Sequence, residues 1–324
     1  MAATGLPLVI ALEEHYYDAE LAATFEGPEG RAGETRRRLL DLGELRIAEM
    51  DAAGIDVQVI SHGAPSVQRL DAETAVWMAR GANDRLAESI AQHPDRFAGF
   101  AALPTPDPEA AAAELDRAVT QLGFKGAMIH GLTNGAFLDE RRFWPIFERA
   151  QALDVPLYLH PAVPHRSVAE TYYQEYLQEF PSILTAGWGF GVETATQAIR
   201  LVLSGAFETY PGLKIVLGHM GEGLPFLLWR LDHAFSRPGN ARGGRPISFR
   251  DEFSQHVWIT TSGNFSTPAL LCSMMELGVD RIMFSVDYPF VQNPPGTAWL
   301  QSLQLSAEDK AKIAGGNAKR LLKL

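Results

Sequence analysis

The chain has 324 residues, of which 46% are hydrophobic, and it carries a formal net charge of -11 at pH 7 with a pI near 5.3. That length suits one large α/β domain or two ordinary ones. The negative charge argues against a surface for nucleic acid or for an anionic membrane. The single cysteine, Cys272, excludes a disulfide framework within the chain.

The first residues carry no recognisable targeting signal. The stretch MAATGLPLVIALEEH lacks the basic segment of a secretory signal, and charge interrupts its apolar run. No other stretch approaches the roughly 18 apolar residues that a membrane span requires. We therefore expect a cytoplasmic protein that spans no membrane.

Short apolar runs rich in β-branched residues recur along the chain and predict strands. They lie at residues 8–12, 57–61, 97–102, 126–129, 156–159, 214–217, 257–261 and 281–285. Amphipathic segments predict helices at residues 44–53, 74–93, 108–121, 143–153 and 194–208, with a closing helix at 307–324. Apolar runs that alternate with helices are typical of parallel strands covered by helices, and eight of them favour an α/β fold of the (β/α)8 (TIM) barrel type. A doubly wound open sheet is the alternative, but no glycine-rich phosphate loop follows the first strand.

Three predicted connections are unusually long, at residues 16–43, 161–190 and 233–256. Connections of this length in a compact domain are usually lids or interfaces. No linker separates the chain into parts. The sequence therefore predicts a single domain over residues 1–324, a TIM barrel with long loop insertions at its mouth.

Polar side chains follow most of the predicted strands, within or just beyond the last residue. They are Glu13, His15, Ser61, His62, His130, His160, His219, Thr261, Ser262 and Asp287. In a parallel barrel the carboxyl ends of the strands meet at one mouth, where active sites are found. The sequence therefore predicts a functional site built from these residues.

Four of these positions have the side chains of a metal site. Residues i and i+2 of a strand point to the same side, so Glu13 and His15 can reach one centre. His160 and Asp287 would arrive from other strands and complete a set of two imidazoles and two carboxylates. Such a set suits a divalent transition metal, Mn²⁺ or Zn²⁺ before Mg²⁺. The alternative is that each histidine only caps a strand through hydrogen bonds, which is less plausible when four positions converge.

The stretch GHMGEG (218–223) predicts a proton relay. A strand delivers His219, and a turn between glycines presents Glu222, which could orient the imidazole while it transfers protons. The alternative is a tight turn with Glu222 at the start of the next helix, which is compatible with a relay. Asp287 would lie next to the metal, to His219, or to both, unless it only caps the following helix.

Aromatic residues cluster near the predicted mouth. Trp188, Phe190, Tyr288 and Phe290 could form the walls of a pocket for a flat substrate. Aromatic residues are also common in protein cores, so a purely structural role remains open at these positions.

Taken together, the motifs resemble the metal-dependent decarboxylase branch of the amidohydrolase superfamily, which includes γ-resorcylate, 2,3-dihydroxybenzoate and aminocarboxymuconate semialdehyde decarboxylases. The resemblance runs along nearly the whole chain. It rests on ALEEH (11–15), GANDRLAESIAQHPDRFAGFAALP (81–104), LYLHP (157–161), GWGFGVETATQAIRLVLSG (187–205), GHMGEGLPFLLWRLDH (218–233), ITTSGNF (259–265) and RIMFSVDYPF (281–290). ALEEH and GHMGEGLP are most similar to the benzoate decarboxylase group.

The resemblance implies a function and a site. It implies a non-oxidative decarboxylase of a small ortho-hydroxybenzoate-type acid, with one divalent metal ion, no organic cofactor and a homodimeric or homotetrameric assembly. Matched position by position, the metal ligands are Glu13, His15, His160 and Asp287, and the relay is His219 with Glu222 beside Asp287. Asp287 is then the group that protonates the ring carbon. Arg230 would bind an anion or a ring substituent, or would be part of a structural ion pair.

Some residues depart from the pattern of related enzymes. Glu13 replaces the first histidine of the His-x-His motif of the superfamily's hydrolases, and Lys125 precedes the fourth strand rather than following it, which favours the decarboxylase branch. His130 stands where the resorcylate enzyme has asparagine, which makes it a candidate substrate contact. Two alternatives stay open: a metal-dependent hydrolase of a lactone or amide that uses a metal-activated water, and a barrel that keeps its ligands only for binding or scaffolding.

Overall fold

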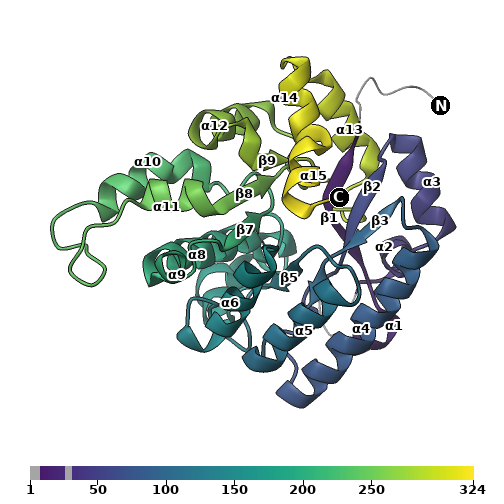
Figure 1. Cartoon of the computed structure of the whole chain (residues 1–324), viewed down its shortest axis with the longest axis horizontal. Coiled ribbons are helices and arrows are strands. Elements are labelled where there is room, and N and C mark those ends of the chain that lie inside the picture. The colour runs from purple at the N-terminus through teal and green to yellow at the C-terminus, as the bar shows by residue number, and fades with distance from the viewer. Residues whose placement is uncertain (1–7, 26–30) are drawn as a thin grey trace.

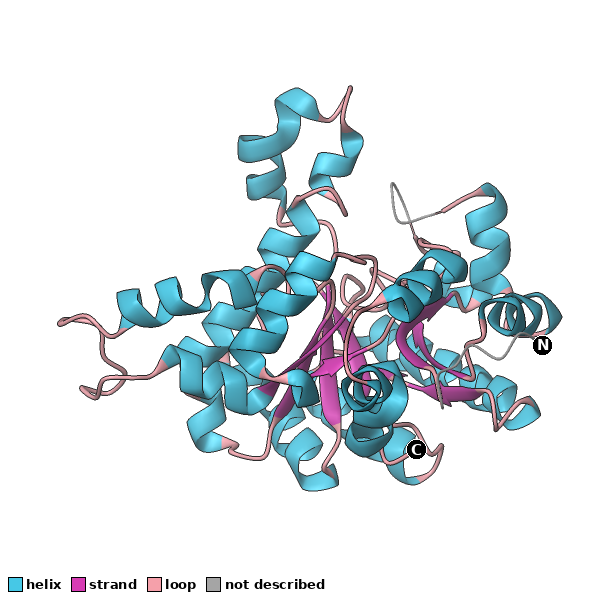
Figure 2. Cartoon of the chain, turned by 90° about the horizontal axis from the view of Figure 1, so that it is seen from above, coloured by secondary structure: helices cyan, strands magenta, loops and turns pink. Residues whose placement is uncertain are grey.

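Parallel strands lie at the centre of the molecule with helices outside them (Figures 1 and 2). The computed structural model describes residues 8–25 and 31–324. The strands are β1 (Ile10–Tyr16), β2 (Val57–His62), β3 (Phe97–Gly99), β4 (Ala101–Ala102), β5 (Ala127–His130), β6 (Pro156–His160), β7 (Lys214–Leu217), β8 (Val257–Thr260) and β9 (Ile282–Met283).

The helices follow the strands in the order of a β/α repeat. They are α1 (Ala19–Ala22), α2 (Gly33–Leu40), α3 (Glu44–Ala53), α4 (Ala72–Gln92), α5 (Pro108–Thr120), α6 (Trp144–Leu153), α7 (Arg166–Val168), α8 (Gly189–Ser204), α9 (Ala206–Thr209), α10 (Leu224–Phe235), α11 (Phe249–His256), α12 (Thr267–Leu277), α13 (Asn293–Ser302), α14 (Ala307–Ala311) and α15 (Asn317–Leu322). Within the described residues, no helix is both long enough and apolar enough to cross a bilayer.

Consecutive strands pair in parallel, in two sheets of order β1-β2-β3 and β4-β5-β6-β7-β8-β9. The predicted strand at residues 97–102 is interrupted at Phe100, whose backbone N–H donates to the Ile60 carbonyl at 2.9 Å. The next N–H, of Ala101, donates to the Gly126 carbonyl at 2.9 Å. One segment therefore bonds to β2 on one side and to β5 on the other, so the wall of strands continues through the interruption.

The last strand meets the first through a short contact rather than a ladder. Glu14 and Tyr288 form one parallel bridge, the His15 N–H donates to the Tyr288 carbonyl at 2.7 Å, and the Asp287 N–H donates to the Glu13 carbonyl at 3.1 Å. The architecture is the α/β, (β/α)8-type barrel that the sequence predicts, although strand pairing between β9 and β1 is reduced to this contact.

Several predicted boundaries differ from the structure. β1 continues to Tyr16 instead of ending at residue 12, so the ALEEH acids and histidine lie within the strand. The predicted closing helix is divided into α14, a π-helical segment at Lys312–Gly316 and α15. A Cβ at Gly315 would lie 2.8 Å from the Leu8 carbonyl oxygen, so this segment packs directly against the chain leading into β1.

The long connections contain more helix than predicted. Residues 161–190 hold α7 and short helical turns at Ala169–Tyr173, Gln174–Tyr176 and Pro181–Leu184. Residues 233–256 hold the end of α10, a loop at residues 236–248 and the whole of α11, and the two helices form a hairpin that extends away from the barrel (Figure 1). α10 begins at Leu224, directly after the GHMGEG turn, where the sequence allowed a helix to start. Residues 26–30 of the first long connection lie outside the described residues.

Two hydrophobic clusters pack on the two sides of the strands. The inner cluster fills the barrel and includes Ile10, Leu12, Val59, Phe100, Met128, Tyr158, Val216 and Met283. Leu321 and Leu322 of α15 belong to it, so the last helix covers one end of the barrel. The outer cluster packs the other faces of the strands against the helices, which leaves the opposite end of the barrel for the polar strand ends.

A β-bulge in β1 decides which residues reach the barrel interior. Ala11 pairs with Gln58, but Glu14 pairs with Ile60, so β1 contains one more residue than β2 between these pairs. Ile10 and Leu12 point inward, and strict alternation would turn Glu14 inward next. The extra residue changes the phase of the strand, so that Glu13 and His15 face the interior instead.

His62, at the end of β2, has a structural role rather than a place in the polar site. The Asp18 N–H, at the start of α1, donates to His62 Nε2 at 3.0 Å, while Nδ1 lies 2.9 Å from the Gly63 carbonyl oxygen. Its ring stacks on Tyr17 with 5.6 Å between centroids. Nε2 must therefore keep its lone pair, and burial lowers the pKa of His62 to about 4.

His62 should make the protein less stable in mild acid. Its pKa is about 4 when folded and about 6.5 when unfolded. The unfolded state therefore binds more protons between these values, and stability falls as pH decreases through them. Its contribution to the free energy of unfolding should fall by about 2 kcal/mol from pH 7 to pH 5.

Urea unfolding of the wild type and of His62→Gln at pH 7 and pH 5 measures the contribution of His62 to this change in the free energy of unfolding. Glutamine does not titrate, so the variant should lose about 2 kcal/mol less than the wild type over the same interval. Equal losses in the two proteins would show that His62 is not the titrating group.

Candidate active site

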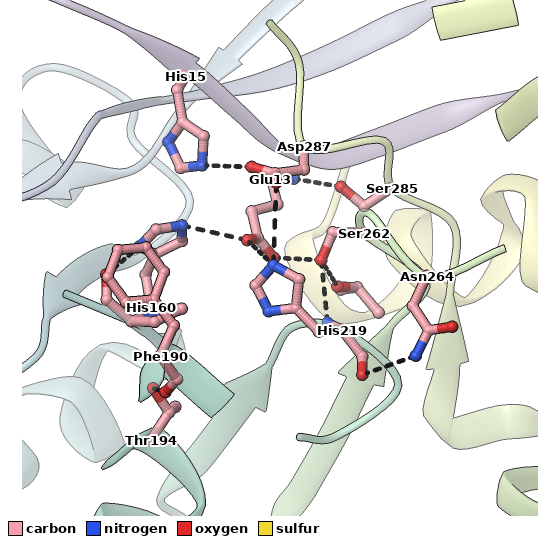
Figure 3. Close-up of polar contacts among 12 residues, drawn as sticks. Glu13, His15, His160, Phe190, Thr194, His219, Ser262, Asn264, Ser285 and Asp287 are labelled. Atoms are coloured by element: carbon pink, nitrogen blue, oxygen red, sulfur yellow. Dashed lines mark hydrogen bonds and ion pairs between the residues drawn. The ribbon is translucent and has the colours of Figure 1, made fainter. Parts of the chain in front are cut away.

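Four metal-competent side chains meet at the polar end of the barrel (Figure 3). Glu13 and His15 come from β1, His160 ends β6, and Asp287 follows β9. One potential ligand atom from each lies within 4.8 Å of every other. His160 Nε2 is 3.2 Å from Glu13 Oε1, and His15 Nε2 is 3.4 Å from Asp287 Oδ1. The structure thus brings together the four residues that the sequence predicts as a set.

The set has the unpaired atoms that a cation requires. Glu13 Oε1, His15 Nε2 and Asp287 Oδ1 are buried, and none has a hydrogen-bond partner among the described residues. Buried polar atoms without partners are unfavourable. A divalent ion bound between them would satisfy all three, and imidazole with carboxylate is a donor set of transition-metal sites. The residues present therefore fit a metal ion.

His219 connects this set to Glu222. His219 Nδ1 lies 2.8 Å from Glu222 Oε1, and Nε2 lies 3.3 Å from Glu13 Oε1 and 3.9 Å from Asp287 Oδ2. Burial by itself lowers the pKa of His219, but the carboxylates of Glu13, Glu222 and Asp287 outweigh burial and hold that pKa well above its ordinary value. The imidazole therefore lies between two carboxylates with a proton available on either nitrogen.

Three residues of this group have unusual backbone conformations. His219, Glu222 and Asp287 have φ values of 49°, 53° and 74°, in the left-handed region that non-glycine residues seldom adopt. Such conformations persist only where surrounding contacts enforce them, and they concentrate at functional sites. Burial raises the pKa of Asp287, but its ion-pair contacts with His15 and His219 reverse the effect and lower that pKa overall.

A cavity of about 1380 Å³ opens over these residues. His160, His219, Glu222 and Asp287 line it on one side. Much of the remaining wall is apolar and includes Trp188, Phe190, Ile199, Leu224, Phe290 and Val291. A mostly apolar cavity with a few convergent polar groups is the usual form of a small-molecule site.

A family model described as amidohydrolase matches residues 15–324. The chain belongs to the amidohydrolase family. Its similarity to characterised decarboxylases places it in the branch that the sequence motifs resemble. Gamma-resorcylate decarboxylase from Polaromonas sp. (strain JS666) is 43% identical over 327 residues, which cover 97% of this chain and 98% of the relative.

Solved structures of similar proteins share this amidohydrolase's fold. A dihydroxybenzoic acid decarboxylase from Polaromonas sp. JS666, with bound manganese and the inhibitor 2-nitroresorcinol, has a TM-score of 0.88 and 42% identity, covering 98% of this chain and 97% of its own. A 5-carboxyvanillate decarboxylase from Novosphingobium aromaticivorans, complexed with manganese and 4-hydroxy-3-methoxy-5-nitrobenzoic acid, has a TM-score of 0.92 and 35% identity, covering 100% and 98%.

Half of the aromatic and polar residues predicted to contact substrate line the cavity of this amidohydrolase. Trp188, Phe190 and Phe290 do so. Trp188 is 62% exposed, so it lies toward the open side of the cavity.

The other three predicted contacts, His130, Tyr288 and Arg230, are not among the described residues that line the cavity. His130 is buried behind His160, with 3.0 Å between their Nδ1 atoms, so its polar atom is turned toward that histidine. Tyr288 is buried with its ring under the Arg46 guanidinium, 4.7 Å away. Arg230 is exposed on α10. Substrate contact by these three residues stays a prediction.

Two hydroxyl groups hold Glu13, and of these sequence reasoning placed Ser262 at the site but missed Tyr158. The Tyr158 and Ser262 hydroxyls both donate to Glu13 Oε2. Thr260 Oγ1 is 2.7 Å from the Tyr158 hydroxyl and 3.0 Å from Ser262 Oγ. Oε1 is thereby left facing the metal-competent set. Strand periodicity could have found Tyr158, because it lies two residues before His160 on β6 and so faces the same side.

Gly218 is required by the position of the Glu13 carboxylate. A Cβ at residue 218 would lie 2.5 Å from Glu13 Oε2 and 3.1 Å from Ser262 Oγ. Gly218 is not among the glycines with positive φ, so the constraint is space rather than backbone conformation. The first glycine of the GHMGEG motif therefore leaves the space that the Glu13 carboxylate occupies.

Gly218→Ala should weaken Mn²⁺ binding by about 10-fold or more, the scale of changes behind a metal ligand, because the methyl group displaces the Glu13 carboxylate. Gly81→Ala in α4 is the matched control, since its backbone is helical and a Cβ there would meet only the end of the flexible Arg85 side chain, at 3.2 Å. Titration of each metal-free protein with Mn²⁺ by calorimetry measures the effect. Equal affinities in the two variants would rule out this constraint.

Proposed function

We propose that this amidohydrolase is a metal-dependent, non-oxidative decarboxylase of an aromatic acid with a hydroxyl group ortho to its carboxylate. The observation that carries the proposal is the set Glu13, His15, His160 and Asp287 beside the His219–Glu222 pair, at the wall of a mostly apolar cavity. The likeness to gamma-resorcylate and dihydroxybenzoic acid decarboxylases supports the same reaction.

Glu13, His15, His160 and Asp287 would hold the ion. Mn²⁺ is the first candidate, since the similar decarboxylases contain manganese, and Zn²⁺ suits the same donors. When bound, the ion supplies a Lewis acid that orients the carboxylate and ortho-hydroxyl oxygens of the substrate and stabilises negative charge on them. The proposal needs no organic cofactor as an electron sink, because the ring, once protonated at the carbon that carries the carboxylate, accepts the electron pair of the bond that breaks.

The residues of the chain move one proton. Asp287 faces the cavity, so it can deliver a proton to the ring carbon that carries the carboxylate. The bond from the ring to the carboxylate carbon then breaks, its electron pair restores the aromatic ring, and CO2 leaves. His219, whose Nε2 lies 3.9 Å from Asp287 Oδ2, would return a proton to Asp287 through one bridging water and regain a proton from solvent in the cavity, and Glu222, 2.8 Å from its Nδ1, orients the imidazole.

The cavity favours a small aromatic acid. Phe190 and Phe290 offer flat apolar surfaces next to the polar set, which suit a benzene ring better than a peptide or a sugar. The cytoplasmic location, the single domain over residues 1–324 and the homodimeric or homotetrameric assembly stay predictions.

The Mn²⁺-loaded protein should release CO2 from ortho-hydroxybenzoates, including the 2,3- and 2,6-dihydroxy acids. Run in deuterium oxide, the reaction should place deuterium on the ring carbon that lost the carboxylate, as NMR would show. Methylation of the ortho hydroxyl should abolish turnover, because it removes an anionic oxygen and adds bulk.

In the same assay His219→Asn should lose about 10²-fold in rate or more while keeping its metal.

Hydrolysis is the competing outcome. Release of an alcohol or amine from a lactone or amide, with no CO2 from any of these acids, would contradict the decarboxylase and support a hydrolase that uses the same metal site. Full activity of His219→Asn would remove the relay from the mechanism but not the reaction.

A further inference from the structure

Glu14 is a fully buried carboxyl group that the reaction just described does not use. The bulge in β1 turns Glu13 and His15 toward the metal-competent set and leaves Glu14 on the other side of the strand. Glu14 is not part of the set, and it does not line the cavity within the described residues. A buried carboxyl group away from the reacting atoms needs another explanation.

All three donors to Glu14 within the described residues come from the segment around Asp287. Glu14 Oε1 accepts from the Val286 N–H at 2.8 Å and from the Ser285 hydroxyl at 3.0 Å. Oε2 accepts from the Tyr288 N–H at 3.1 Å. The carboxyl group therefore accepts from the backbone N–H groups of Val286 and Tyr288, the residues immediately before and immediately after Asp287.

The segment needs such an acceptor because the strand has already ended. β9 stops at Met283, and in the described part of the chain the only bridge to β1 beyond it is Glu14 with Tyr288. The backbone N–H of Asp287 itself reaches the Glu13 carbonyl at 3.1 Å. The N–H groups on either side donate to the Glu14 side chain, which takes the place of a strand partner.

Asp287 also has a conformation that must be enforced. Its φ of 74° lies in the left-handed region, which costs free energy for a residue with a side chain. Hydrogen bonds on both flanking peptide groups hold the chain in that conformation and direct the Asp287 carboxylate toward His15 and His219 (Figure 3). From the arrangement of these contacts we infer that Glu14 is a positioning residue for Asp287, acting on the metal site through the backbone of residues 285–288.

Glu14→Gln tests the inference with little change in shape. An amide nitrogen, unlike either oxygen of a carboxyl group, accepts no hydrogen bond, so in either orientation one donor beside Asp287 loses its partner. Mn²⁺ titrated into the metal-free protein should bind about 10- to 100-fold more weakly, as for other changes to groups behind a metal ligand. The consequence of this variant for decarboxylation rests on the proposed function. The Mn²⁺ titration needs no substrate, so failure of the inference about Glu14 is distinguishable from failure of the proposed function.

A double-mutant cycle separates positioning from a general structural effect. If Glu14 acts through Asp287, Glu14→Gln should change Mn²⁺ affinity by less than about 2-fold in an Asp287→Asn background. The matched control is Glu114→Gln in α5, a buried carboxylate held by Asn83 and Arg117 at 2.7 and 2.8 Å. It should lower the unfolding temperature without changing Mn²⁺ affinity.

Two results would overturn the inference: wild-type Mn²⁺ affinity in Glu14→Gln, or the same loss of affinity in the wild-type and the Asp287→Asn backgrounds. If Glu14→Gln does not fold, Glu14→Asp replaces it, since the shorter side chain keeps both oxygens but retracts them from the three donors. The expected direction and the contradicting results are the same for that variant.

Discussion

Buried carboxylate and imidazole atoms without hydrogen bonds are the constraint on which the rest of this structure depends. Among the described residues, Glu13 Oε1, His15 Nε2 and Asp287 Oδ1 are withdrawn from water and make no hydrogen bond, and they face other members of the site at 3.2–3.4 Å. A fold stabilised mainly by apolar burial tolerates such a group only when the surrounding contacts hold it and a ligand satisfies it. A bound cation accounts for all three atoms together, and the surrounding residues account for their position.

Those surrounding residues hold the set from several directions. The Tyr158 and Ser262 hydroxyls occupy one oxygen of Glu13, and the absence of a side chain at Gly218 leaves room for it. On the far side of β1, Glu14 accepts from the backbone N–H groups of Val286 and Tyr288, on either side of Asp287. The bulge in β1 decides which acid has which role, because its phase change turns Glu13 toward the interior and leaves Glu14 on the other side.

Much of the fold and the centre of the site could be predicted from the sequence. Apolar runs alternating with amphipathic segments indicated the order of strands and helices, since burial on both faces leaves a clear pattern. The four metal-competent residues were found because strand ends converge in a barrel. The same rule placed His130 correctly at the end of β5, but its ring packs against His160 and does not line the cavity within the described residues, and side-chain packing of this kind is not encoded in strand position.

Long-range contacts explain the other differences between the sequence-based predictions and the structure. The phase change in β1 depends on pairing with β2, and the role of Glu14 depends on a segment more than 270 residues away in the chain, so neither has a local signal. Tyr288 was expected at the substrate from its place beside Asp287, but its ring packs against Arg46 of α3. Local pattern therefore located the reactive groups, whereas the contacts that orient them required the tertiary structure.

The most direct test of this account is a crystal structure of the protein grown with Mn²⁺, with anomalous diffraction used to locate manganese. The account predicts one anomalous peak at coordination distance, about 2.0–2.3 Å, from Glu13 Oε1, His15 Nε2, His160 Nε2 and an oxygen of Asp287. A peak held by other residues, or a four-residue set with no manganese at saturating concentration, would contradict it.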